Sequence, residues 1–130
     1  MNLANILIVE PDTVLSNIYK DFFTKAGFEV VLCNDGQKAI DAVDNAKPDL
    51  IILELQLTSH NGYEFLYELR SYKEWQTIPV IINTLIPESK TRLNSNNIHD
   101  LGVVGYLYKP TSSLEKLKNL VENYVLTTHI

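Results

Sequence analysis

The sequence predicts an α/β domain in which a five-stranded parallel sheet carries helices on both faces. Short apolar runs alternate with amphipathic segments along the whole chain, which is typical of strands joined by helices. The runs at residues 6–9 and 50–53 are apolar at every position, as expected for strands buried on both sides. A chain of 130 residues has the length of one domain, and we take this domain to span residues 1–130.

The first helix follows the strand at residues 6–9. Asp12 can cap this helix through its side-chain oxygen, and Gly27 suits the left-handed residue that ends many helices. These signals place the helix at about residues 12–26. Apolar side chains at three- and four-residue spacing mark one face of the helix. The expected buried face consists of Leu15, Ile18 and Phe22.

The middle of the chain contains two further strands and two helices. The Val-rich residues 29–33 form the second expected strand, and a helix follows the turn at residues 34–36 and ends before Pro48. Residues 50–53 are the most apolar run, so we expect them at the centre of the sheet. The third helix begins at residues 61–62. The inward side chains of these two helices are expected to be Ala39, Ile40, Val43, Phe65, Leu66 and Leu69.

The last part of the chain supplies two strands and a final helix. The strands are expected at residues 80–82 and 103–108, and the helix at about residues 112–126. Residues 87–101 are rich in Pro, Ser and Asn, which are poor in helix interiors, so we expect a short or broken helix there. The inner face of the final helix is expected to hold Leu114, Leu117, Val121 and Tyr124.

The composition excludes several functional classes. A net charge of −5 disfavours direct binding to a phosphate backbone. No apolar run approaches the ~20 residues that a membrane-spanning helix needs, and we find no signal peptide at the N-terminus. Cys33 is the single cysteine, so the chain has no internal disulfide and no cysteine-based zinc site. From these features we expect a cytoplasmic protein.

Charged and hydroxyl side chains follow the strands at their carboxyl ends. Glu10 and Asp12 follow the first strand, Glu54 the third, Thr84 the fourth and Lys109 the fifth. Because these ends meet at one edge of a parallel sheet, we expect a shared crevice. Three carboxylates repel one another unless a cation joins them, and Mg²⁺ or Lys109 can do so. A Glu54–Lys109 pair is worth about 4 kcal/mol at ~4 Å before desolvation.

Four segments in this order resemble those of response-regulator receiver domains. They are residues 6–12 (ILIVEPD), 48–55 (PDLIILEL), 78–84 (IPVIINT) and 102–110 (GVVGYLYKP). The resemblance covers nearly the whole chain. It implies a flavodoxin-like (βα)5 receiver fold and a role in two-component or phosphorelay signal transduction.

The resemblance implies a role for each matching residue. Glu54 stands where the family has the aspartate that accepts a phosphoryl group from a histidine kinase. In the family, Mg²⁺ is held by that aspartate, by an acidic pair matching Glu10 and Pro11, and by the carbonyl matching Gln56. Pro11 removes one carboxylate of the pair, and Asp12, which is also needed as a helix cap, is its substitute. A weak Mg²⁺ site of Glu10, Asp12, Glu54 and Gln56 is therefore expected, with no other cofactor.

Other matches belong to the switch of the family. Thr84 matches the residue that bonds the phosphoryl oxygen, Lys109 the residue that neutralises its charge, and Tyr106 the aromatic side chain that turns inward in the active state. Two departures bear on this switch. Glu54 is one methylene longer than aspartate, so a phosphoryl group on it would be displaced from its partners. The segment between residues 84 and 102 is a few residues longer than is typical of the family.

Our hypothesis is a pseudo-receiver that is not an enzyme. Glu54 either imitates the phosphorylated state or belongs to a plain docking surface. The implied partners are a histidine kinase or a downstream effector, bound through the face formed by the family's fourth helix, the fifth strand and the last helix. A homodimer through this face is a candidate assembly. Neither direct nucleic-acid binding nor membrane binding is expected.

Three alternatives stay open at this point. The intact set of Thr84, Tyr106 and Lys109 favours a working Mg²⁺-dependent phosphoacceptor. The Glu54–Lys109 pair can also be a relic that only stabilises the fold. A nucleotide- or flavin-binding domain is disfavoured, because the loop after the first strand is acidic and Pro11 lacks the N–H that phosphate binding uses.

Overall fold

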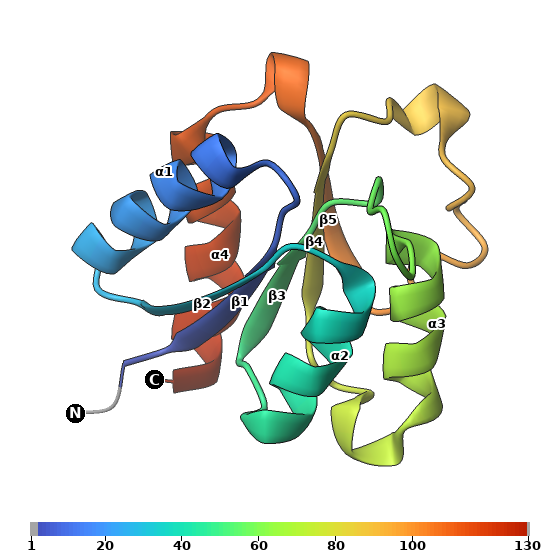
Figure 1. Ribbon diagram of the computed structural model, residues 1–130, viewed down its shortest axis with the longest axis horizontal. Coiled ribbons are helices and arrows are strands. Elements are labelled where there is room, and N and C mark those ends of the chain that lie inside the picture. The colour runs from blue at the N-terminus through green and yellow to red at the C-terminus, as the bar shows by residue number, and fades with distance from the viewer. Residues whose placement is uncertain (1–2, 130) are drawn as a thin grey trace.

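The computed structural model describes residues 3–129, and within them one parallel sheet has the strand order β2-β1-β3-β4-β5 (Figure 1). The strands are β1 (Asn5–Val9), β2 (Glu29–Cys33), β3 (Leu50–Leu53), β4 (Val80–Thr84) and β5 (Val103–Tyr108). The helices are α1 (Thr13–Lys25), α2 (Gly36–Asn45), α3 (Gly62–Ser71) and α4 (Leu114–His129), with short 3₁₀ turns η1 (Lys73–Trp75), η2 (Glu88–Lys90) and η3 (Lys109–Thr111). The predicted α/β fold is confirmed, with β3 at the centre of the sheet. None of the described helices is long and apolar enough to cross a membrane.

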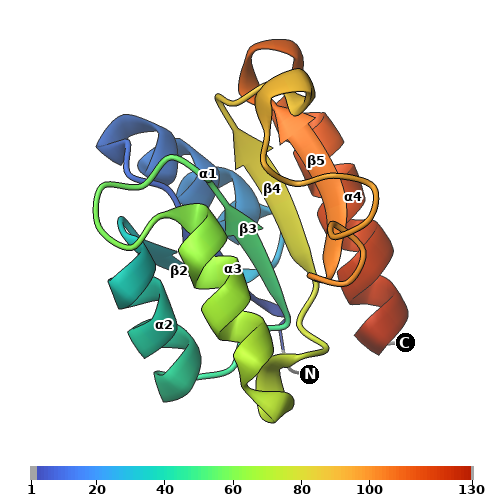
Figure 2. The same cartoon turned by 90° about the vertical axis from the view of Figure 1, so that its right-hand side faces the viewer.

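Helices cover both faces of the sheet (Figures 1 and 2). The helices α1 and α4 pack on one face, where Ile6, Ile8 and Ile52 point from the strands. The helices α2 and α3 pack on the other face, against Leu7 and Val9 among others. Neighbouring strand residues point to opposite faces, so a strand covered on both sides must be apolar at every position. This packing leaves the two ends of the strands as the places where charged side chains can gather.

The strand register aligns the carboxyl ends of the central strands. Val9 pairs with Leu53 between β1 and β3, and Leu53 pairs with Ile82 between β3 and β4. On the far side of β4, Thr84 pairs with Tyr108 of β5. β1 and β3 therefore end at the same level, and β4 and β5 extend two residues further toward the same edge of the sheet.

The buried face of α1 differs from the prediction. Its buried residues are Ser16, Tyr19 and Phe23. Ile18 was expected inside but is 44% exposed, whereas Leu15 and Phe22 are partly buried at the margin of the core. The physical reason lies in Tyr19, whose hydroxyl accepts a hydrogen bond of 3.1 Å from the buried Asn83 side chain. A tyrosine with a partner for its hydroxyl can enter a core, so the helix turns this residue inward.

The other helix faces follow the predictions more closely. The inward residues of α2 and α3 are as expected, and each is at most 7% exposed. In α4, Leu117 and Val121 are buried and Leu114 is partly buried. Tyr124 was wrongly placed inside: it is 38% exposed, and Val125 occupies the core position at 1% exposure. Both residues lie near the edge of the apolar stripe of α4. Tertiary packing, and not the spacing of apolar residues in the sequence, therefore determines which of the two is buried.

The segment between β4 and β5 contains one 3₁₀ turn, η2, and a series of turns in place of an α-helix. The Asn94 side chain accepts hydrogen bonds from the backbone N–H groups of Asn96 and Asn97 at 2.8 and 3.1 Å. Such local bonds compete with helix formation, as the composition led us to expect. Leu93 and Leu101 anchor the segment in the core. The expected docking face therefore lacks the family's fourth helix and presents an irregular segment instead.

Candidate functional site

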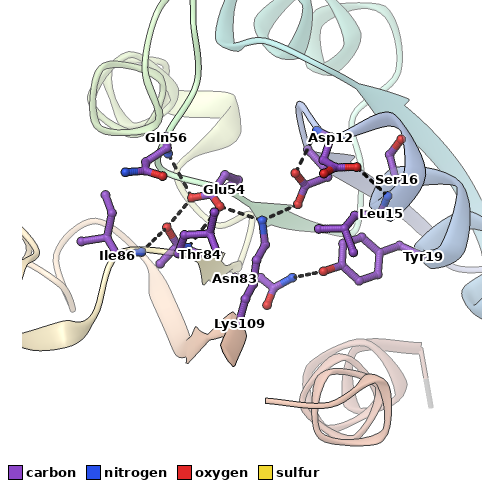
Figure 3. Close-up of polar contacts among 12 residues, drawn as sticks. Asp12, Leu15, Ser16, Tyr19, Glu54, Gln56, Asn83, Thr84, Ile86 and Lys109 are labelled. Carbon is purple, nitrogen blue, oxygen red and sulfur yellow. Dashed lines mark hydrogen bonds and ion pairs between the residues drawn. The ribbon is translucent and has the colours of Figure 1, made fainter. Parts of the chain in front are cut away.

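Four side chains from four strand ends meet at one edge of the sheet, at the predicted crevice, and Figure 3 labels three of them, Glu54, Thr84 and Lys109. Glu10 directly follows β1, Glu54 follows β3, Thr84 is the last residue of β4, and Lys109 follows β5. The sheet holds the backbones of both glutamates, because the N–H of Glu10 donates to the Cys33 carbonyl and that of Glu54 to the Val9 carbonyl. Side chains scattered over about one hundred positions of the sequence are thereby fixed at one edge.

Lys109 bridges the two glutamates. Its Nζ lies 2.6 Å from Glu10 Oε1 and 2.6 Å from Glu54 Oε1. The side chains are 9%, 3% and 2% exposed for Lys109, Glu10 and Glu54 respectively, so solvent screens these ion pairs weakly. Burial lowers the pKa of Lys109, but the hydrogen bonds and charges of Glu10 and Glu54 outweigh burial and raise that pKa above its ordinary value. Lys109 is accordingly charged at neutral pH.

The carboxylate of Glu54 is surrounded by hydrogen-bond donors. Its Oε1 accepts from Lys109 Nζ and from the backbone N–H of Leu85 at 3.2 Å. Its Oε2 accepts from the Thr84 hydroxyl and from the backbone N–H of Gln56 at 3.0 Å. Each oxygen therefore has two donors from the protein, which compensate the buried charge.

Asp12 lies beside the crevice and uses its carboxylate elsewhere. Its Oδ1 accepts from the backbone N–H of Leu15 at 3.0 Å, which makes it the N-cap of α1. Its own N–H donates to Glu10 Oε2 at 3.1 Å, so Asp12 supports the pocket through its backbone. Of the predicted acidic residues, Glu10 and Glu54 therefore meet around Lys109, whereas the Asp12 side chain serves the helix.

The arrangement does not fit a bound Mg²⁺ ion. Mg²⁺ demands oxygen ligands in near-octahedral geometry, but both oxygens of Glu54 already accept two hydrogen bonds each. Gln56 faces Glu54 with its N–H, and Pro11 offers no carboxylate. Within the described residues, no group of three or more His, Cys, Asp or Glu side chains is placed to hold a metal. We therefore derive no chemical step through Mg²⁺.

A chain of hydrogen bonds leads from Glu54 to Tyr106. The Thr84 oxygen that donates to Glu54 accepts from the backbone N–H of Ile86 at 3.2 Å. The carbonyl of Ile86 then accepts from the Tyr106 hydroxyl at 2.6 Å. Tyr106 is half-buried against the core on the α2 and α3 side of the sheet, and burial raises the pKa of its hydroxyl. The contact links the crevice to the segment before β5.

Sequence reasoning missed the contribution of main-chain donors. Leu85 and Gln56 act through N–H groups, which every residue type except proline has, so no sequence signal marks them. The Asn83–Tyr19 contact, which lies beside Lys109 in Figure 3, was missed as well. A signal for it existed, because an asparagine inside a strand buried on both faces requires a partner. Asn83 is 4% exposed and directly precedes Thr84.

The fold and the site together define a flavodoxin-like α/β domain with a charged crevice at its strand ends. The family model of the response regulator receiver domain matches residues 6–122. The chain belongs to this family, and its general role is that of a receiver domain in two-component signalling. Domains of this family are generally regulatory rather than catalytic.

Curated relatives agree with this assignment. The chain is 35% identical over 121 residues to the probable transcriptional regulator ycf29 of Porphyra purpurea, which covers 93% of this chain and 56% of the relative. It is 28% identical over 108 residues to the polar-differentiation response regulator DivK of Brucella anthropi, covering 83% of this chain and 85% of DivK. The chain thus spans a little over half the length of the ycf29 relatives that it matches.

Solved structures share the fold. A CheY-like response regulator receiver domain protein from Methanospirillum hungatei has a TM-score of 0.85 at 20% identity, covering 98% of each chain. The receiver domain of the sensor histidine kinase PA1611 from Pseudomonas aeruginosa has a TM-score of 0.82 at 23% identity, covering 95% of this chain and 98% of that one. The PA1611 domain was solved with a magnesium ion in its active-site cleft.

Proposed function

We propose that this chain is a pseudo-receiver whose Glu54 carboxylate imitates the phosphorylated aspartate of the family. The observation that carries this proposal is the set of donors around Glu54. Thr84 and Lys109 match the residues that, in the family, contact the phosphoryl group, and here both contact the Glu54 carboxylate directly. The extra methylene of glutamate carries the carboxylate toward the place where a phosphoryl group on aspartate begins.

Phosphorylation of Glu54 is disfavoured by the same geometry. An incoming phosphoryl group needs the space and the donors that the carboxylate already uses. A displacement near 1 Å costs about a hundredfold in rate where transfer depends on positioning. The loss of one acidic partner at Pro11 works in the same direction, since it weakens the cation site that transfer in this family requires.

The output of such a domain is docking to another signalling protein. The surface proposed for this contact consists of β5, α4 and the segment before β5. The Tyr106 hydroxyl donates to the Ile86 carbonyl, and the Ile86 N–H donates to the Thr84 hydroxyl that contacts Glu54. These two bonds fix the conformation at the start of that segment. Leu85, at 52% exposure, is an apolar contact point on this surface. A histidine kinase, a downstream effector or a second copy of the chain fits the proposal.

The decisive experiment is intact-mass analysis after incubation with acetyl phosphate and MgCl₂. The expected result is no mass gain for the natural chain. Glu54→Asp is the informative variant, because it restores the shorter acceptor and is expected to gain some labelling. A gain of one phosphoryl group at Glu54 in the natural chain would overturn the proposal in favour of a working phosphoacceptor, the alternative that the Thr84, Tyr106 and Lys109 set supports.

A second experiment separates an imitated active state from a relic ion pair. Glu54→Gln keeps the side-chain length but removes the charge that Lys109 and Thr84 contact. If Glu54 sets the state of the docking surface, the amide NMR signals of Ile86 and Tyr106 shift in this variant. If the pair is a relic, the shifts stay confined to the crevice. Asp44→Asn, an exposed charge removal on α2, serves as the control.

A further inference from the structure

We propose that Lys109 is the built-in cation of the crevice and takes the place of a divalent metal ion, so that the site is complete without Mg²⁺. This inference deepens the proposed function and rests on it, because a carboxylate that imitates a phosphoryl group must stay charged and buried without help from solution. The cation of the site is thus an internal ammonium in place of a metal ion.

The Lys109 ammonium lies between two buried carboxylates. Nζ of Lys109 lies at the same distance, 2.6 Å, from Glu10 and from Glu54. A cation placed evenly between two buried carboxylates relieves their mutual repulsion, which is the electrostatic task of a metal in an acidic crevice. The three side chains are all less than one tenth exposed, so a hydrated ion has little access to the space between them.

The other carboxylate oxygens of Glu10 and Glu54 also have hydrogen-bond donors. Glu10 Oε2 accepts from the Asp12 N–H, and Glu54 Oε2 accepts from Thr84 and the Gln56 N–H. An incoming Mg²⁺ would have to displace Lys109 and at least one of these donors. Mg²⁺ also dehydrates reluctantly, so weak or partial ligand sets do not compete with its water shell.

Proline at position 11 removes one of the family's metal ligands. The family's second acidic ligand matches Pro11, whose ring offers no oxygen, and the next carboxylate, that of Asp12, is bonded to Leu15 as the cap of α1. Recruiting Asp12 to a metal would leave the helix without its N-cap, which destabilises the helix. The chain thus lacks a metal ligand at Pro11, and Lys109 forms ion pairs with the two remaining carboxylates, those of Glu10 and Glu54.

The test is titration of the natural chain with MgCl₂, followed by amide NMR of Glu10, Glu54 and Gln56. The expected result is no saturable shift at millimolar Mg²⁺, and no selective broadening of these signals by Mn²⁺. The double variant Pro11→Asp/Glu54→Asp restores the family's ligands and is expected to show saturable shifts. This variant proves that the method detects binding at this edge of the sheet. Saturable shifts in the natural chain would overturn the inference.

A second measurement removes the internal cation. Lys109→Ala leaves Glu10 and Glu54 facing each other, so its melting temperature is expected to rise on addition of Mg²⁺, because a ligand that binds only the folded state stabilises it. The natural chain and Lys118→Ala, which removes a lysine paired with Glu115 on α4, are expected to show no such rise. A rise in the natural chain equal to that in Lys109→Ala would contradict the inference. If Lys109→Ala does not fold, the NMR titration still decides.

The experiments give different results if this inference is wrong and if the proposed function is wrong. Mg²⁺ binding without any mass gain from acetyl phosphate would remove the role of Lys109 as substitute cation and leave the pseudo-receiver proposal intact. Phosphorylation of Glu54 in the natural chain would remove the pseudo-receiver proposal whatever the metal titration shows.

Discussion

The Nζ atom of Lys109 lies 2.6 Å from Oε1 of Glu54, although the two residues are 55 positions apart in the sequence. Glu54 is 2% exposed and Lys109 9%, so neither charge can return to water without a rearrangement of the strand ends. A buried pair of this kind adds little to stability by its presence, because desolvation offsets the attraction between the charges. Removing one partner is costly, since the other is left buried and unpaired.

The first prediction concerns Lys109→Met, which keeps most of the side-chain volume and removes the charge. The variant leaves the buried carboxylates of Glu10 and Glu54 without the cation that lies between them. We expect the free energy of unfolding to fall by about 3–5 kcal/mol. Urea denaturation followed by circular dichroism near neutral pH measures the change.

The matched control for this prediction is Lys118→Met. Lys118 pairs with Glu115 at 3.5 Å on the surface of α4, where Glu115 is 68% exposed. An exposed pair of this type contributes about 0–1 kcal/mol. Equal losses in the two variants would mean that the crevice pair behaves like a surface pair, and the electrostatic account of the site would then be wrong.

The second prediction is the pH dependence that Lys109 imposes. Burial lowers its pKa, but Glu10 and Glu54 outweigh burial, so the pKa in the folded chain lies above the ordinary value of 10.5. A raised pKa on a basic group means that the folded state binds the proton more tightly than the unfolded state. The stabilisation is therefore fully present below pH 10.5 and is lost as the pH rises from there through the folded-state pKa.

Comparison with Lys109→Met isolates this effect. Burial also raises the pKa of Tyr19 and Tyr106, and these groups destabilise the fold in the same alkaline range. Because both proteins carry the tyrosines, the tyrosine contributions largely cancel in the difference in unfolding free energy, apart from the lowering of the Tyr19 pKa by the Lys109 charge. We expect this difference to be constant from neutral pH to about pH 10 and to shrink above it. If the difference in unfolding free energy between the two proteins grew above about pH 10, its pH dependence would be opposite to the predicted one. Lys109 would then be excluded as the source of that pH dependence.

The third prediction concerns Thr84→Val, which removes a hydroxyl and keeps the shape of the side chain. The hydroxyl donates to Glu54 and accepts from the Ile86 N–H, and Thr84 is fully buried. Its loss is expected to lower the unfolding free energy by about 1–3 kcal/mol, because a buried charged oxygen loses a donor. Thr77→Val, at an exposed position before β4, is the control and should change stability by about 0.5 kcal/mol or less. If both variants are equally stable, the hydroxyl is not needed to satisfy Glu54.

Most of the fold could be predicted from the sequence because strands buried on both faces leave a direct signal. The runs at residues 6–9 and 50–53 are apolar at each position, as strands covered on both faces require. The orientation of helices was harder to predict. Tyr19 faces the core because Asn83, 64 positions away, provides a partner for its hydroxyl, and no local spacing reveals such a contact. Tyr124 and Val125 are neighbours at the edge of a stripe, where small rotations decide burial.

The residues of the crevice could be predicted as a set, but their interactions could not. Parallel topology alone brings the ends of β1, β3 and β4 together, so Glu10, Glu54 and Thr84 were expected to be neighbours. Which donor satisfies which oxygen depends on distances of a few tenths of an ångström. Asp12 illustrates the limit, since its residue type suits both a cation site and a helix cap, and only the structure shows that it caps α1.

The fourth prediction concerns Gly36, the first residue of α2, which touches the loop after β3. Its N–H donates to the Ser59 carbonyl at 3.1 Å, and a Cβ atom at this position would overlap the backbone carbonyl of His60. Helix propensity alone predicts that Gly36→Ala stabilises the chain by up to about 1 kcal/mol. Because backbone atoms, unlike flexible side-chain ends, cannot move aside cheaply, we expect instead a net loss of about 1–3 kcal/mol.

The sign of this change distinguishes the two effects. Urea denaturation gives the free energy, with Gln37→Ala at the next, exposed position of α2 as the control for helix propensity. The displaced loop also contains Gln56, whose N–H donates to Glu54 Oε2. We therefore expect the Gln56 amide signal to shift in Gly36→Ala and to stay in place in Gln37→Ala. A Gly36→Ala chain that is more stable and has an unchanged Gln56 signal would show that the loop can yield, and that α2 and the crevice are not coupled through it.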